Sequence, residues 1–120
     1  MKTKHTFQIR QGDVFIEQVE PPKDLGEVVP REGGAVVLAY GESSGHRHQI
    51  AAKGAKLFQR GSTRMLEISA RGGAVLAVTS DRGEQLTPER HVPVKLPPGT
   101  HKVTIQREWT IEQSIRRVLD

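Results

Sequence analysis

A tight turn followed by strict alternation makes residues 97–109, PPGTHKVTIQREW, the most informative segment for the fold. Proline presets the backbone for a turn and Gly99 can take a positive φ, so the Pro-Pro-Gly triplet predicts a sharp reversal. Side chains at odd positions from 101 to 109 then share one face, and the residues between them share the other. This alternation predicts a half-buried strand, with Trp109 in the core and His101 in the core or an interface.

Similar signals recur along the rest of the chain. Short apolar or alternating runs lie at about 14–19, 35–40, 55–59, 64–69, 74–79 and 92–96, separated by turn residues such as Gly12-Asp13, Gly61-Ser62 and Gly72-Gly73. Their close spacing is typical of antiparallel hairpins. We therefore predict an all-β fold, a small antiparallel barrel or sandwich of roughly eight strands, in a single domain spanning residues 1–120.

Two of these runs carry additional information. The unbroken apolar run at 35–40 predicts burial on both faces, or on one face against a partner chain. Pro93 cannot donate a backbone hydrogen bond, so it predicts an edge or irregular strand around 92–96.

Residues 110–119 predict a short C-terminal helix. Thr110 can cap it and Gln113 completes a capping box. Its apolar residues then fall on one helix face: Ile111, Ile115, Val118 and Leu119. A helix of this length needs a surface to dock on, either its own barrel or a neighbouring subunit.

Composition narrows the class of protein. The 120 residues are 35% apolar and include few aromatics, so the core is lean and a homo-oligomer that shares apolar surface is expected. There is no cysteine, which excludes disulfide scaffolds, thiolate metal sites and cysteine nucleophiles. No apolar run is long enough for a signal sequence or a membrane span, so we expect a cytoplasmic protein with no membrane contact.

Charge is spread evenly along the chain. The net charge is +4, and each half carries nine basic and seven acidic side chains. A nucleic-acid-binding protein usually concentrates its basic residues, so we do not expect nucleic acid as a partner. Folding could still gather arginines such as Arg60, Arg64 and Arg71 on one face.

The segment His46-Arg47-His48 is the main candidate for a functional site. Residues two apart in a strand share a face, so both imidazoles can converge on one metal ion. His91 is the natural third ligand, and Glu42 or Glu89 could add a carboxylate. Such a donor set suits Zn, Fe, Mn, Ni or Cu, and Arg47 with Glu42 could hold an anionic or polar ligand beside the ion.

Two other interpretations of the histidines remain open. They can bind an anion or a partner without metal, or they can be exposed residues of a Gly-Ser turn with no special role. Serine-hydrolase and P-loop chemistry are not favoured, because neither motif is complete around Ser43, Ser44 or Gly45.

The arrangement of these motifs resembles the small cupin-type β-barrels. The resemblance rests on Gly45-His46-x-His48, the later His91 and the Pro-Pro-Gly turn before a final strand. It implies a cupin-like, jelly-roll-like barrel that holds a metal through His46, His48 and His91. The glutamate that the first cupin motif places a few residues later is missing, because Ala51, Ala52 and Lys53 occupy that stretch.

A second set of segments is similar to short proteins of unknown function from bacteria and their phages. These segments are 11–14 (QGDV), 37–42 (VLAYGE), 45–46 (GH), 96–99 (LPPG) and 106–108 (QRE). They run across most of the chain and imply a stand-alone domain, without a mechanism.

Three functions therefore remain for a sequence of this kind. The first is a small β-barrel protein that binds a metal or ligand through histidines. The second is a non-enzymatic structural or assembly module that uses the run at 35–40 and the C-terminal helix for subunit contacts. The third is a weak, non-specific nucleic-acid binder. The sequence identifies no general base, so it leaves open whether the protein is an enzyme.

Overall fold

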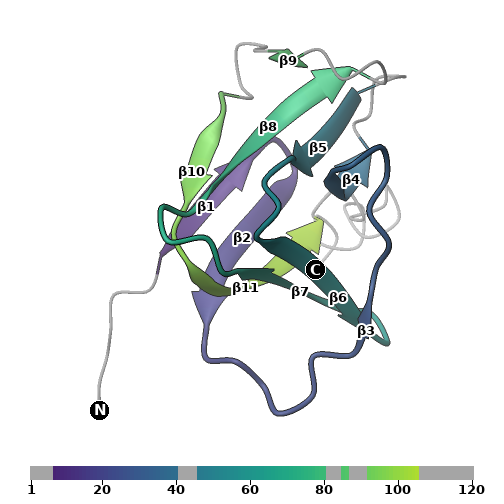
Figure 1. Ribbon diagram of the computed structural model, residues 1–120, viewed down its shortest axis with the longest axis vertical. Helices are drawn as coiled ribbons and strands as arrows, with labels where there is room; N and C mark the ends of the chain where they lie inside the picture. The colour runs from purple at the N-terminus through teal and green to yellow at the C-terminus, as the bar shows by residue number, and fades with distance from the viewer. Residues whose placement is uncertain (1–6, 41–45, 81–84, 87–91, 106–120) are drawn as a thin grey trace, which may run out of the picture.

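The computed structural model describes residues 7–40, 46–80, 85–86 and 92–105. Two antiparallel sheets make up this described part (Figure 1). The first sheet has six strands, in the order β1 (Gln8–Gln11), β2 (Val14–Val19), β11 (Gly99–Ile105), β7 (Thr63–Ile68), β6 (Ala55–Arg60) and β3 (Glu27–Val28). The long strand β11, which begins at the glycine of the Pro-Pro-Gly triplet, pairs with β2 on one side and β7 on the other. The segment that best predicts a strand therefore lies at the centre of this sheet.

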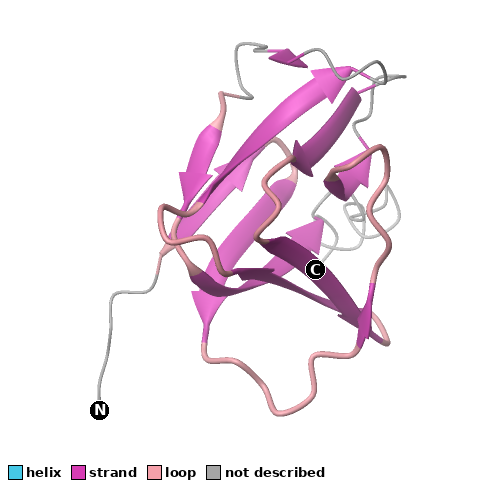
Figure 2. Cartoon of the chain, viewed as in Figure 1, coloured by secondary structure: helices cyan, strands magenta, loops and turns pink. Residues whose placement is uncertain are grey.

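The second sheet contains the histidine segment. Its order is β10 (Val94–Leu96), β8 (Ala74–Ser80), β5 (His46–Ile50) and β4 (Val36–Tyr40), and β9 (Gln85–Leu86) also pairs with β8. Among the described residues no backbone pairing joins the two sheets, and no closed barrel is seen there. Figure 2 shows only strands and loops in this part of the chain.

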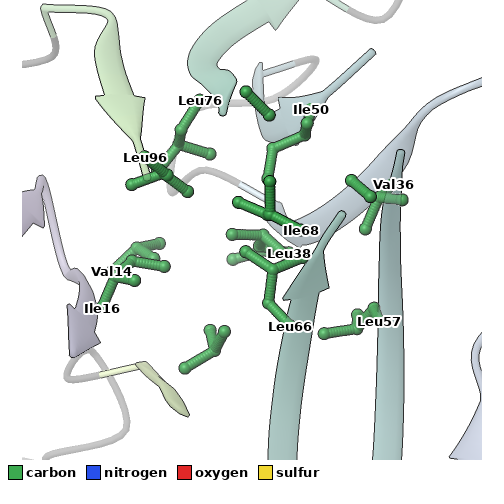
Figure 3. Close-up of a cluster of buried hydrophobic side chains, with 14 residues drawn as sticks. Val14, Ile16, Val36, Leu38, Ile50, Leu57, Leu66, Ile68, Leu76 and Leu96 are labelled. Atoms are coloured by element: carbon green, nitrogen blue, oxygen red, sulfur yellow. The ribbon is translucent and has the colours of Figure 1, made fainter. Parts of the chain in front are cut away.

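One apolar cluster fills the space between the sheets (Figure 3). Both sheets contribute fully buried side chains: Ile16, Leu57 and Leu66 from the six-stranded sheet, and Ile50 and Leu76 from the five-stranded sheet. Removing such side chains from water is the main stabilising term, at about 1.5–3 kcal/mol for each one fully buried. The sheets are thus joined through their side chains.

Several expectations about individual segments are confirmed. Residues from Ala35 to Ala39 are all buried within the single chain, whereas Tyr40 is half exposed. Strand β10, which follows Pro93, lies at an edge of its sheet. His101 is fully buried, as expected for a core histidine.

Other expectations need correction or lie outside the described residues. Eleven strands are described instead of roughly eight, because local patterns contain no clear signal for β1, β3 and β9. Strands β3 and β9 have two residues each and are defined only by their partners. The predicted helix at 110–119 and Trp109 lie outside the described part. In that part, no helix has the length and apolar character to cross a membrane.

The β1–β2 hairpin brings a polar side chain into the core. Gly12 has a φ of 61° and is the first residue of the two-residue turn, a position where glycine suits hairpins. Gln11 and Val14 flank this turn as a cross-strand pair, so their side chains share the inner face. Val14 is fully buried and Gln11 is 1% exposed. A hairpin turn therefore places an amide inside the protein.

Candidate metal centre

Strand β5 carries both histidines of the His46-Arg47-His48 segment and lies between β4 and β8. Because side chains alternate along a strand, His46 and His48 share the face of the buried Ile50, which is turned toward the other sheet. His48 is only 2% exposed, whereas His46 is partly exposed. The two imidazoles therefore extend from the interior toward the solvent-accessible end of the strand.

The buried amide of Gln11 holds the inner histidine. Its Oε1 lies 2.8 Å from His48 Nδ1, and its Nε2 donates to the carbonyl oxygens of Leu76 and Val92, both at 3.0 Å. These bonds connect the first strand with β5, with β8 and with the residue that follows His91 in the sequence. A buried amide that has both N–H groups and its oxygen hydrogen-bonded is well fixed, and losing a partner would be costly.

Arg47 lies on the other face of β5. Its guanidinium carbon is 5.9 Å from the centre of the Tyr40 ring, its cross-strand neighbour on β4. The Tyr40 hydroxyl donates to Glu32, and this carboxylate raises the pKa of Tyr40. The structure therefore places Arg47 beside an exposed tyrosine that is bonded to a carboxylate, on the opposite face of β5 from the imidazoles of His46 and His48.

The other predicted site residues lie outside the described part of the chain: His91, Glu42 and Glu89. Among the residues that the structure describes, no group of three His, Cys, Asp or Glu side chains is placed to hold a metal ion. The described part thus supplies two of the three predicted ligands, His46 and His48.

His101, the last histidine of the sequence, belongs to the core side of the six-stranded sheet. Its Nε2 lies 2.8 Å from the carbonyl oxygen of Pro97, and its ring meets that of Phe7 edge-on at 6.0 Å. Burial lowers the pKa of His101. This packed imidazole, for which burial favours the neutral form, is therefore a core residue and not part of the candidate site.

Gln11 was not among the residues predicted for the site. A signal existed in its position, because it directly precedes a Gly-Asp hairpin turn and pairs with Val14, the first residue of an apolar strand. A polar residue at a core-facing position requires a hydrogen-bond partner. The partner is 37 residues away in the sequence, and local patterns cannot identify it.

The chain matches a known protein family over most of its length. The family described as "Domain of unknown function (DUF8820)" matches residues 10–106. The chain belongs to the DUF8820 family. The DUF8820 match includes Gln11, His46 and His48, and it ends before the predicted C-terminal helix. No curated protein matches the chain, and neither does any solved structure.

Proposed function

We propose that this protein is a small metal-binding protein with a cupin-like, jelly-roll-like architecture. His46, His48 and His91 would hold a divalent transition ion, of the group Zn, Fe, Mn, Ni and Cu. The observation that supports it best is the bond between Gln11 and His48. Ligating histidines generally use the second ring nitrogen in such a bond, which orients the imidazole toward the ion.

The connection from Gln11 to Val92 supports the inclusion of His91. The carbonyl of Val92 accepts a hydrogen bond from the same amide that holds His48. His91 is the preceding residue in the chain, and for this reason we keep it as the third ligand of the proposal.

Three neutral imidazoles would leave coordination positions for water or a small ligand. A bound ion of this kind activates water or oxygen, so an enzyme is one form that the proposal can take. The protein's own contribution would be a rigid strand that presents two ligands and a largely apolar interior around them. Arg47 lies on the other face of β5 and is not part of the proposed coordination sphere.

Metal content tests the proposal directly. Untagged wild-type protein and the His46→Ala/His48→Ala variant should be analysed by plasma mass spectrometry, with His5→Ala as a histidine-loss control. We expect near-stoichiometric metal in the wild type and the control, and loss of the metal in the double variant. Protein that stays metal-free after exposure to Zn, Fe, Mn, Ni and Cu would refute the proposal.

A second candidate, the assembly module, receives less support from the structure. It relied on the apolar run at 35–40 as a subunit contact, but Ala35 to Ala39 are buried within one chain. The run therefore needs no partner to remove it from water. A homo-oligomer remains part of our proposal only through the lean core that the composition indicates, and light scattering after chromatography measures it.

A further inference from the structure

The hydrogen bonds of Gln11 restrict the protonation of His48. The side-chain Nε2 of Gln11 has two hydrogens, and both are directed at carbonyl oxygens, those of Leu76 and Val92. An exchange of the amide nitrogen and oxygen would bring the Gln11 oxygen against two other oxygens, so this orientation is determined. The amide oxygen must then face His48 Nδ1 as an acceptor.

An acceptor at 2.8 Å requires that His48 Nδ1 carries a hydrogen. In the neutral imidazole the lone pair is then on Nε2. Both side chains are almost fully buried, at 1% exposure for Gln11 and 2% for His48, so water does not compete effectively for this bond. The tautomer of His48 is thus selected by a residue 37 positions earlier in the chain.

We infer that Gln11 is the positioning residue of the proposed metal site, because it makes His48 present Nε2 as its ligating atom. This inference rests on the proposed function for its purpose, but the tautomer can be measured without metal. Gln11 does not contact the ion in this assignment. It acts through His48, in the manner of the partners that orient ligating histidines in known sites.

The first test is the tautomer in metal-free protein. A long-range ¹H–¹⁵N correlation spectrum at neutral pH distinguishes the two neutral forms of each histidine, and a His48→Ala spectrum assigns the signals. We expect His48 to carry its hydrogen on Nδ1. A wild-type spectrum with the hydrogen on Nε2 would overturn the inference, whatever the metal content.

The second test changes the acceptor. Gln11→Met keeps the size of the side chain but removes the oxygen that accepts from Nδ1, whereas Gln8→Leu changes an exposed glutamine of the same strand as a control. We expect the Met variant to lose the exclusive Nδ1–H form and to bind Co²⁺ or Zn²⁺ on the order of 10–100-fold more weakly, while the control keeps both properties.

The outcomes separate the inference from the function on which it rests. A Met variant that keeps the wild-type tautomer and metal affinity would reduce Gln11 to a packing role and contradict the inference. If that variant fails to fold by circular dichroism, the wild-type tautomer decides. An Nδ1–H tautomer in a protein that binds none of the five metals would refute the metal site but leave the assignment of His48 intact.

Discussion

His101 shows how one buried side chain can link stability to pH. Its Nε2 donates to Pro97, and its Nδ1 is buried without a hydrogen-bond partner among the described residues. Protonation would place a charge at that nitrogen in an apolar environment, which explains why the pKa is lowered from its ordinary value of 6.5. The folded protein therefore favours the neutral imidazole.

The pKa of His101 is lower in the folded protein than in the unfolded chain, and this difference determines the sign of the pH dependence. The unfolded chain takes up the proton first as the pH falls, so the stabilisation is complete above about pH 6.5 and declines as the pH falls toward the folded-state pKa. One such group changes the free energy of unfolding by up to about 1.4 kcal/mol per pH unit. Urea unfolding at several pH values between 5 and 7.5 should show a smaller pH dependence for His101→Leu than for the wild type. Identical pH profiles would contradict this account.

At the scale of elements, the turn between β7 and β8 contains two adjacent glycines with different requirements. Gly73 has a φ of 82°, and a Cβ there would lie 2.2 Å from the carbonyl oxygen of Leu96 on β10. Gly72 has open space around the same position. The backbone of Gly73 thus approaches the edge strand too closely for any side chain.

These two glycines form a matched pair for a test. Gly73→Ala should lower the free energy of unfolding by at least about 2 kcal/mol, since it combines a left-handed backbone with a clash against β10. Gly72→Ala is exposed and should change it by no more than about 0.5 kcal/mol. Urea unfolding of both variants measures the difference, and equal effects would show that β10 does not lie against Gly73.

Local patterns predicted the elements that carry their own signal and missed those that depend on partners. The alternation from His101 to Ile105 identified β11, and the two-residue period of side chains along a strand placed His46 and His48 on one face. Nothing local indicates that the Arg31 guanidinium binds carbonyl oxygens of Ala55, Gly34, Ala51 and Ala52, or that Gln11 reaches His48. Such bonds depend on which loops and strands meet, and one sequence does not contain that information in readable form.

For the whole molecule, two buried or half-buried polar side chains connect sheets that share no backbone pairing in the described part. Gln11 reaches from the six-stranded sheet to Leu76 and His48. Arg64 on β7 donates to the carbonyl oxygen of Leu38 at 2.6 Å, where the β4–β5 pairing shifts its register. Both bonds satisfy groups that would otherwise be buried without partners, at about 1–3 kcal/mol each.

The positions of the two bonds predict how they combine. Gln11 and Arg64 are three strands apart, which corresponds to about 14 Å, and they share no partner. We expect Gln11→Met and Arg64→Met each to lower the free energy of unfolding by about 1–3 kcal/mol, and the double variant to lower it by their sum within about 0.5 kcal/mol. Equilibrium urea unfolding of the four proteins provides the cycle. A loss well below the sum would mean that one substitution already separates the sheets locally. A loss well above it would mean that each bond supports the geometry of the other. Either result would contradict the view that the two bonds stabilise the contact between the sheets independently.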